Sequence, residues 1–157
     1  MNSEEKNKKG KELLIKLLKS GETVDVPAQG LSMFPFLLPS DIIRVRPEKA
    51  EKLRRGQIVV YVQDHKIISH RYIKTKKGKI ICKGDGLINY DLPVLPGNML
   101  GVVVARTRKN KILSFEKASN RFTGRILSFV TPVTGVFFHY LSFAWYKWFY
   151  NKKQSVS

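Results

Sequence analysis

The stretch Gly56-Gln57-Ile58-Val59-Val60-Tyr61-Val62 decides the fold, because a glycine followed by a run of β-branched residues is typical of a buried strand. A turn signal at Asp64-His65 ends the run. A second apolar run over residues 67–73 follows directly and contains a serine, a histidine and an arginine. The two runs predict neighbouring strands, the second of which has polar side chains among the apolar ones.

Further short strands extend this pattern on both sides. Residues 42–46 alternate between apolar and basic side chains, residues 79–83 follow a Lys-Gly turn signal, and residues 100–105 follow Pro-Gly-Asn. Short strands separated by turn signals are typical of small antiparallel barrels and sandwiches. We therefore predict a mainly β fold, a compact antiparallel barrel or sandwich over residues 24–113.

An amphipathic helix is expected within residues 1–23, before the first strand. Residues 9–20 have the apolar spacing of one helical face, and Gly21 is a plausible end. The helix is suited either to packing on the edge of the domain or to lying on a membrane surface. No secretory signal is recognisable here, because the first ten residues are strongly polar. The expected inner face consists of Leu13, Leu14, Leu17 and Leu18.

The C-terminal part divides into a connector over residues 114–125, an apolar segment over residues 126–150, and a tail over residues 151–157. The apolar segment is rich in aromatic residues and is about long enough to cross a bilayer core. It is compatible with a spanning helix, a bent interfacial hairpin or a helix docked on the domain. We expect membrane contact here. If the segment spans, Arg121 and Arg125 favour a catalytic domain on the cytoplasmic face.

The chain of 157 residues is strongly basic. Its formal net charge is +17, from 29 Lys and Arg against 12 Asp and Glu, which favours an anionic partner. We expect an anionic membrane surface and no nucleic acid, since no nucleic-acid-binding motif accompanies the charge. We expect no cofactor and no metal, because no phosphate loop, dinucleotide fingerprint or ligand cluster is present. The single Cys82 excludes an internal disulfide.

Candidate catalytic residues follow one another in the order Ser, His, Asp. A serine hydroxyl becomes a good nucleophile when a nearby base takes its proton, and a histidine titrates near neutrality. A carboxylate can then hold the imidazole in one tautomer. Ser32, His70 and one of two acids, Asp85 or Asp91, supply these groups. The residues themselves do not separate the two acids, because both also lie in turn-forming sequences.

Four motifs in the same order resemble those of type I signal peptidases and their relatives. Residues 30–35, Gly-Leu-Ser-Met-Phe-Pro, resemble the Ser-Met-x-Pro box, and residues 55–61 resemble the Gly-Asp-(Ile/Val)-Val strand. Residues 69–73 resemble the catalytic strand, and residues 83–103 resemble the closing motifs. The resemblance covers roughly residues 28–108, most of the predicted β domain.

The resemblance implies a fold and an activity. It implies a signal-peptidase-like β domain and a serine endopeptidase that cleaves signal or leader peptides, with Ser32 as nucleophile and His70 as general base. The histidine resembles the endoplasmic-reticulum type, since most bacterial members have lysine there. The resemblance favours Asp91 as the partner of His70 and Asp85 as support for the loop. It also places four residues beside the substrate: Gly30, Met33, Phe34 and Pro35. Met33 and Phe34 are equally suited to the core.

Three departures from the family pattern stand beside the resemblance. Gly30 occupies a position where many relatives have a serine that helps to form the oxyanion hole, so the Ser32 N–H is the main donor left. Gln57 replaces the usual aspartate, and no membrane span precedes the β domain. We therefore expect a specialised peptidase of leader peptides rather than one of general signal-peptide cleavage.

Two other functions compete with the peptidase. One is a non-catalytic basic protein that binds an anionic membrane or nucleic acid with the same fold. The other is a self-cleaving repressor, which needs a lysine base and an N-terminal DNA-binding domain. Only about thirty residues precede Gly30, too few for a three-helix DNA reader.

Overall fold

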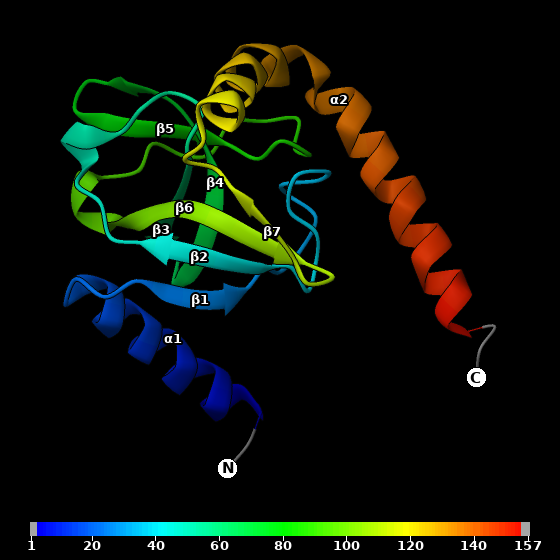
Figure 1. Ribbon diagram of the computed structural model, residues 1–157, viewed down its shortest axis with the longest axis horizontal. Coiled ribbons are helices and arrows are strands. Elements are labelled where there is room, and N and C mark those ends of the chain that lie inside the picture. The colour runs from blue at the N-terminus through cyan, green and yellow to red at the C-terminus, as the bar shows by residue number, and fades with distance from the viewer. Residues whose placement is uncertain (1–2, 155–157) are drawn as a thin grey trace.

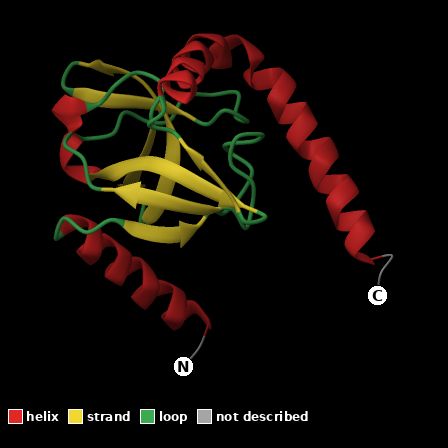
Figure 2. Ribbon diagram, in the orientation of Figure 1, coloured by secondary structure: helices red, strands yellow, loops and turns green. Residues whose placement is uncertain are grey.

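The computed structural model describes the backbone of residues 3–154 and the side chains of residues 5–117, 120–129 and 136–147. A strongly curved β sheet forms the centre, with one long helix at each end of the chain (Figures 1 and 2). In chain order the elements are α1 (Ser3–Lys19), β1 (Val24–Pro27), β2 (Ile42–Arg46), η1 (Ala50–Lys52), β3 (Ile58–Gln63), β4 (Lys66–Lys76), β5 (Lys79–Lys83), η2 (Pro96–Asn98), β6 (Met99–Arg108), β7 (Lys111–Ser114) and α2 (Ala118–Gln154).

The seven strands belong to one sheet with the order β1-β2-β6-β3-β4-β5, and β7 pairs with β6. Each strand pairing in the sheet is antiparallel, which confirms the predicted mainly antiparallel β fold. The sheet does not close, because β1 and β5 stand at opposite ends of the strand order and the described strands show no pairing between them. Of the expected barrel or sandwich, the closed form of the barrel is therefore not what the chain adopts.

Tight turns set the register of the strands that hold the candidate residues. Asp64 and His65, between β3 and β4, have φ angles of 50° and 58°. Turns of this kind suit the right-handed twist of a hairpin, so the two strands pair directly. The register places Val59 of β3 opposite His70 of β4. Neighbouring residues of a strand point to opposite faces, so His70 and Arg71 face different sides of the sheet.

The two faces of the sheet pack into two apolar clusters. On one face, Val60 packs in a cluster with Leu18 of α1 and Met33 of the loop between β1 and β2. On the other face, Val59 belongs to a cluster with Cys82 of β5. Because β3 contributes alternate residues to both clusters, it forms the centre of the fold. The first four residues of β3, Ile58 to Tyr61, are all buried.

Helix α1 packs on the edge of the domain, which is the first of its two expected positions. Leu18 is buried, and Leu14 and Ile15 pack against the same cluster. Leu13 is 57% exposed, so the prediction that it lies on the inner face is wrong. The spacing of Leu14, Ile15 and Leu18 fits one helical face. The inner face is therefore rotated by about one residue relative to the expectation.

Helix α2 begins at Ala118, inside the expected connector, and continues to Gln154 as one helix. The bent hairpin expected as one alternative is therefore wrong. In the parts of the chain that the structure describes, no helix has both the length and the apolar character needed to cross a bilayer. Within the expected tail, residues 155–157 lie outside the described part. The side chains of residues 130–135 and 148–150 in the apolar segment lie outside it as well.

The beginning of α2 is docked directly on the β domain. A side-chain carbon added at Gly56 would lie 2.5 Å from the backbone of Gly124, so only a glycine allows the helix to approach the turn before β3 this closely. The Nε–H of Arg55 donates to Ser128 Oγ at 2.9 Å. Further along α2, the ring of Phe138 meets that of Phe36 edge-on with centroids 6.5 Å apart. The helix thus contacts the loop between β1 and β2 as well as the sheet.

Candidate active site

Ser32 lies in the loop between β1 and β2, which is anchored to a second loop that follows β5. The Ser32 carbonyl accepts a hydrogen bond from the Gly86 N–H at 2.9 Å. A side-chain carbon added at Gly84 would lie 2.6 Å from the same carbonyl oxygen. The neighbouring Met33 is 3% exposed and holds the loop to the core. Gly84 and Gly86, directly after β5, therefore support the backbone of the candidate nucleophile.

His70 of β4 forms a buried pair with Asp91. The distance from His70 Nδ1 to Asp91 Oδ2 is 2.8 Å, and the two side chains are 7% and 10% exposed. The Tyr61 hydroxyl donates to the same Asp91 oxygen at 2.8 Å. Burial raises the pKa of Tyr61, and the Asp91 carboxylate raises it further, so the hydroxyl stays protonated as a donor. Asp91 thus accepts from both a tyrosine and a histidine.

This pair fixes the tautomer of His70. When Nδ1 carries the proton and donates it to Asp91, the lone pair of the imidazole remains on Nε2. That arrangement is the one a general base requires, because Nε2 is then free to accept a proton. Within the described residues no hydrogen bond joins the Ser32 hydroxyl to His70. Nucleophile–base contacts are often looser before substrate binds.

Asp85 lies away from His70 and pairs with Arg71. Two parallel hydrogen bonds join Arg71 Nε and a terminal guanidinium nitrogen to the carboxylate at 2.8 and 2.6 Å. The other terminal nitrogen donates to the Gly56 carbonyl at 2.6 Å. Both side chains of the ion pair are almost fully buried. Arg71, held by Asp85, therefore links β4 to the turn at Gly56, on which α2 is docked.

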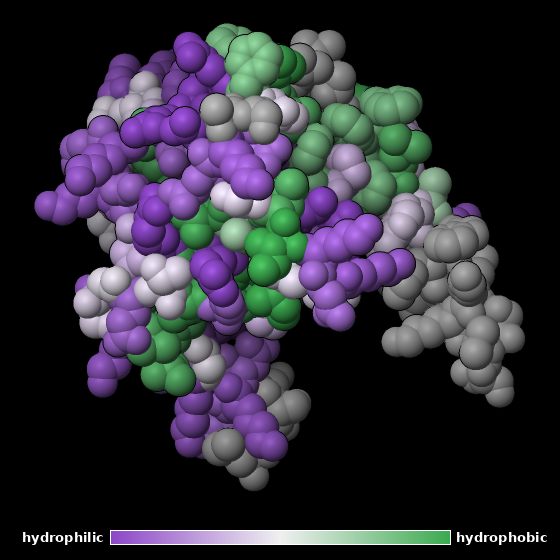
Figure 3. Space-filling model, in the orientation of Figure 1, coloured by the Kyte–Doolittle hydropathy of each residue, from purple (hydrophilic) through white to green (hydrophobic). Residues whose placement is uncertain are grey.

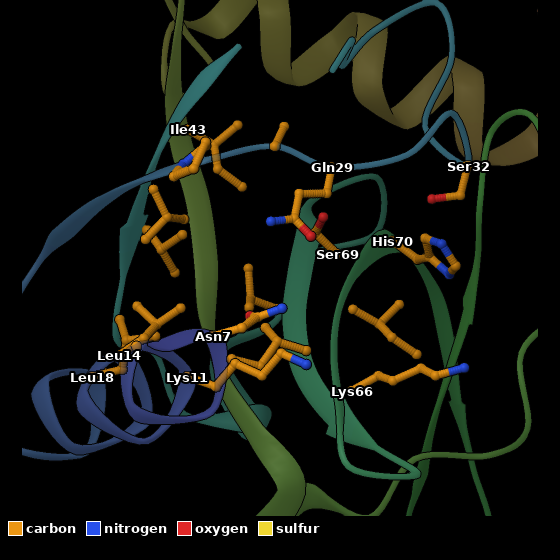
Figure 4. Close-up of a pocket in the computed structure, with 18 residues that line it drawn as sticks. Asn7, Lys11, Leu14, Leu18, Gln29, Ser32, Ile43, Lys66, Ser69 and His70 are labelled. Atoms are coloured by element: carbon orange, nitrogen blue, oxygen red, sulfur yellow. The ribbon is translucent and has the colours of Figure 1, made fainter. Parts of the chain in front are cut away.

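Ser32 and His70 line one cavity of about 660 Å³. Both are labelled on the side of the view away from α1 (Figure 4). The lining includes residues 26–29 at and after the end of β1 and residues 66–70 of β4. In this part β4 pairs only with β3, because its pairing with β5 begins at Arg71. The floor is apolar and includes Ile43, Val45 and Val60.

The four expected substrate-binding residues lie outside the described lining of this cavity. Met33 is in the core, as one alternative allowed, and Gly30 is exposed with a φ of +73°. Phe34 and Pro35 are half-buried. The ring of Phe34 lies 6.0 Å from that of Trp145, so this side chain contacts α2. Of the Ser-Met-x-Pro box, only Ser32 reaches the cavity.

Sequence reasoning missed the supporting residues of both buried pairs. The sequence places Tyr61 in an apolar strand and Arg71 next to His70, and neither position alone indicates a buried partner. Strand alternation offered a signal, because Tyr61 and Val59 share a face and Val59 lies opposite His70. Lys83 is also fully buried; burial lowers its pKa, and the charges of Asp85 and Asp91 oppose that shift. Burial raises the pKa of the Cys82 thiol, which suits an inert core residue.

Among the residues that the structure describes, no group of three or more His, Cys, Asp or Glu side chains is arranged to hold a metal ion. Comparisons of the chain with protein-family models, with curated proteins and with solved structures found no match. The geometry of Ser32, His70 and Asp91 is therefore the main basis for assigning a function.

Proposed function

We propose that this chain is a membrane-associated serine endopeptidase of the signal peptidase I type, which cleaves signal or leader peptides. One observation supports the proposal above all others. The buried hydrogen bond between His70 Nδ1 and Asp91, 2.8 Å long, lies at the wall of a cavity that Ser32 also lines. This arrangement supports Ser32 as nucleophile, His70 as base and Asp91 as orienting acid.

In the proposed reaction, Ser32 Oγ attacks the carbonyl carbon of the scissile peptide bond while His70 Nε2 takes the hydroxyl proton. Asp91 stabilises the imidazolium that forms and holds its orientation. The Ser32 N–H donates to the oxyanion of the tetrahedral intermediate. His70 then gives the proton to the leaving amine, and water hydrolyses the acyl-enzyme by the same route in reverse.

The substrate in this proposal binds as an extended strand. The segment of β4 before His70 has one edge that is unpaired among the described strands, and it borders the cavity. An edge of this kind offers backbone N–H and C=O groups to an added strand, and alternate side chains of that strand enter pockets. The apolar floor suits apolar substrate side chains near the cut.

The membrane part of the proposal rests on α2. Apolar side chains gather over this helix on the visible face of the molecule (Figure 3). Several of them are at least half exposed, and they lie on a chain of net charge +17, so an anionic lipid surface would meet both apolar and basic groups. These exposed residues are Phe129, Phe137, Tyr140, Phe143 and Tyr146.

Sedimentation with lipid vesicles tests the membrane part. We expect binding to vesicles that contain phosphatidylserine, and weaker binding after Phe137→Glu and Phe143→Glu together. A matched control is Ile112→Glu, an exposed apolar residue of β7 rather than α2. If the Phe137→Glu and Phe143→Glu double variant sediments with the vesicles to the same extent as wild type, α2 has no role in membrane binding.

Labelling with a fluorophosphonate probe tests the catalytic part. We expect the wild-type chain in detergent to be labelled, and both Ser32→Ala and His70→Ala to lose the label. Ser69→Ala is the matched control, because Ser69 also lines the cavity next to His70. Labelling that persists in Ser32→Ala would mean that another residue is the nucleophile. A folded wild-type chain that stays unlabelled would favour the second candidate, a non-catalytic basic binding protein. The net charge of +17 supports this candidate.

A further inference from the structure

Helix α1 forms one wall of the cavity, at the end away from Ser32 and His70 (Figure 4). Asn7, Lys11, Leu14 and Leu18 line it, and their spacing of four, three and four residues places them on one helical face. Leu18 anchors this face in the core, so the polar residues Asn7 and Lys11 are held beside the cavity. The N-terminal helix is therefore part of the groove that the proposed substrate would occupy.

The charge of this end of the cavity is positive. Lys11 extends from α1 in the direction of β4, whereas the side chain of Lys66 on β4 points away from Lys11 (Figure 4). The described lining residues include neither Asp nor Glu. Among the side chains that the structure describes, neither lysine forms an ion pair with a carboxylate. A carboxylate that enters this end would meet a cation without displacing an acidic neighbour.

The length of the groove sets where such a carboxylate would lie on a peptide. Lys66 precedes His70 by four residues, and a strand rises about 3.3 Å per residue, so the two positions are about 13 Å apart. A peptide that pairs with this edge of β4 as a strand has the same rise per residue as β4. The side chain that reaches the end of the groove at Lys11 is thus about four residues from the bond at Ser32.

We infer that Lys11 makes this site selective for peptides with an acidic side chain about four residues from the scissile bond, separated from it by apolar residues. The inference rests on the proposed function and names its substrate class. Lys11 acts here as a specificity-determining residue, because it would contact the substrate and not the reacting atoms. The apolar floor accounts for the residues between the acid and the cut.

Binding of synthetic peptides tests the inference separately from catalysis. The full-length Ser32→Ala chain is titrated with alanine- and leucine-rich peptides of about ten residues, each with a neutral fluorophore and an amidated C-terminus. One Glu is placed in turn at each position on either side of a central Ala-Ala, and each peptide has a Gln counterpart. We expect the Glu peptide to bind about fivefold more tightly at one or two positions, since an exposed ion pair contributes modestly. The preference should disappear in about 1 M salt.

Variants of α1 identify the cation. Lys11→Met should remove the preference for Glu, measured as the ratio of the Glu and Gln affinities of that variant, whereas Lys11→Glu should prefer a Lys peptide at the same position. Lys16→Met is the matched control, because Lys16 is an exposed lysine of α1 outside the cavity lining and should keep the preference.

Each remaining outcome decides between the two proposals. Equal binding of Glu and Gln peptides at every position, no measurable binding of any peptide, or a preference that persists in Lys11→Met would overturn the inference. A preference only for peptides with a free C-terminal carboxylate would also overturn it. Cleavage by the wild-type chain without a preference for Glu would leave the peptidase proposal standing alone. A preference that depends on Lys11 in a chain without probe labelling or cleavage would retain the peptide site and remove the peptidase.

Discussion

Two acids, Asp91 and Asp85, pair with the consecutive residues His70 and Arg71 of β4. They differ in the kind of partner that they hold. Asp91 accepts hydrogen bonds from His70 and Tyr61 at the wall of the cavity. Asp85 forms a doubly hydrogen-bonded ion pair with Arg71, which also binds the Gly56 carbonyl. One acid orients a group that can exchange a proton, and the other balances a permanent cation.

The difference follows from the alternation of side chains along a strand. His70 and Arg71 face opposite sides of the sheet, so the two acids are separated although both come from one loop region. An arginine stays charged at all accessible pH values and is suited to a fixed structural pair. A histidine changes charge near neutrality and is suited to proton transfer. The comparison predicts that activity and stability can be lost independently by changes at the two sites.

The largest expected effect is on the rate, from Asp91→Asn. The amide leaves His70 without the acceptor that fixes its tautomer, and we expect kcat to fall about ten-thousandfold if the proposed mechanism holds. The fold should change little, because the substitution keeps the shape of the side chain. Single-turnover cleavage of a labelled peptide measures the rate. A rate close to that of wild type would contradict the assignment of Asp91.

The next largest effect is on stability, from Asp85→Asn. Arg71, which is 4% exposed, would lose its anion and remain buried with an uncompensated charge. We expect the free energy of unfolding to fall by about 3 to 5 kcal/mol in urea titrations. The double variant Arg71→Met with Asp85→Leu should recover part of this loss. If Asp85→Asn unfolds at the same urea concentration as wild type, the pair does not support the fold.

A smaller effect on the rate is expected from Tyr61→Phe. This change removes one hydrogen bond to Asp91 and keeps the bond from His70. We expect kcat to fall about tenfold, in line with the energy of one buried hydrogen bond to a charged group. Tyr72→Phe is a control, because that hydroxyl bonds Thr75 and not Asp91. A decrease as large as that of Asp91→Asn would mean that Tyr61 has a role of its own in the reaction.

The smallest effect concerns a third acid, Asp41, far from both sites in the chain. Burial raises its pKa, but hydrogen bonds from Arg108 and from the Leu38 N–H outweigh burial, so the pKa lies below its usual range. The unfolded chain therefore binds the proton more readily, and the stabilisation is complete above the unfolded value of about 3.9. It is lost as the pH falls through the lower, folded value. Urea titrations between about pH 5 and pH 3 should show a shallower decrease for Asp41→Asn than for wild type.

The sequence predicted the order and type of most elements, because the strands are short and the turns that separate them are distinct. It also predicted Ser32, His70 and Asp91 as candidates. It could not separate Asp91 from Asp85, since the chain between β5 and η2 has no periodic pattern and each acid lies in a turn-like sequence. That choice depends on long-range contacts, which a local pattern does not contain.

Other differences have equally specific causes. The connector was expected over residues 114–125, yet α2 already begins at Ala118, and the close approach of Gly124 to Gly56 docks its first turns on the domain. Leu13 has the same helical spacing as its buried neighbours, but the sheet covers only the face of Leu14 and Leu18. In both cases the partner surface decides the outcome, and that surface is assembled from distant residues.

The contact between Phe34 and Trp145 has an optical consequence. The chain has two tryptophans, Trp145 and Trp148, and both belong to α2. The ring of Trp145 lies 6.0 Å from that of Phe34, two residues after Ser32. Intrinsic tryptophan emission therefore reports on the helix alone and is sensitive to its contact with the loop of the candidate nucleophile. A shift of the emission maximum on addition of lipid or peptide would show, without any label, whether either one moves α2 relative to that loop.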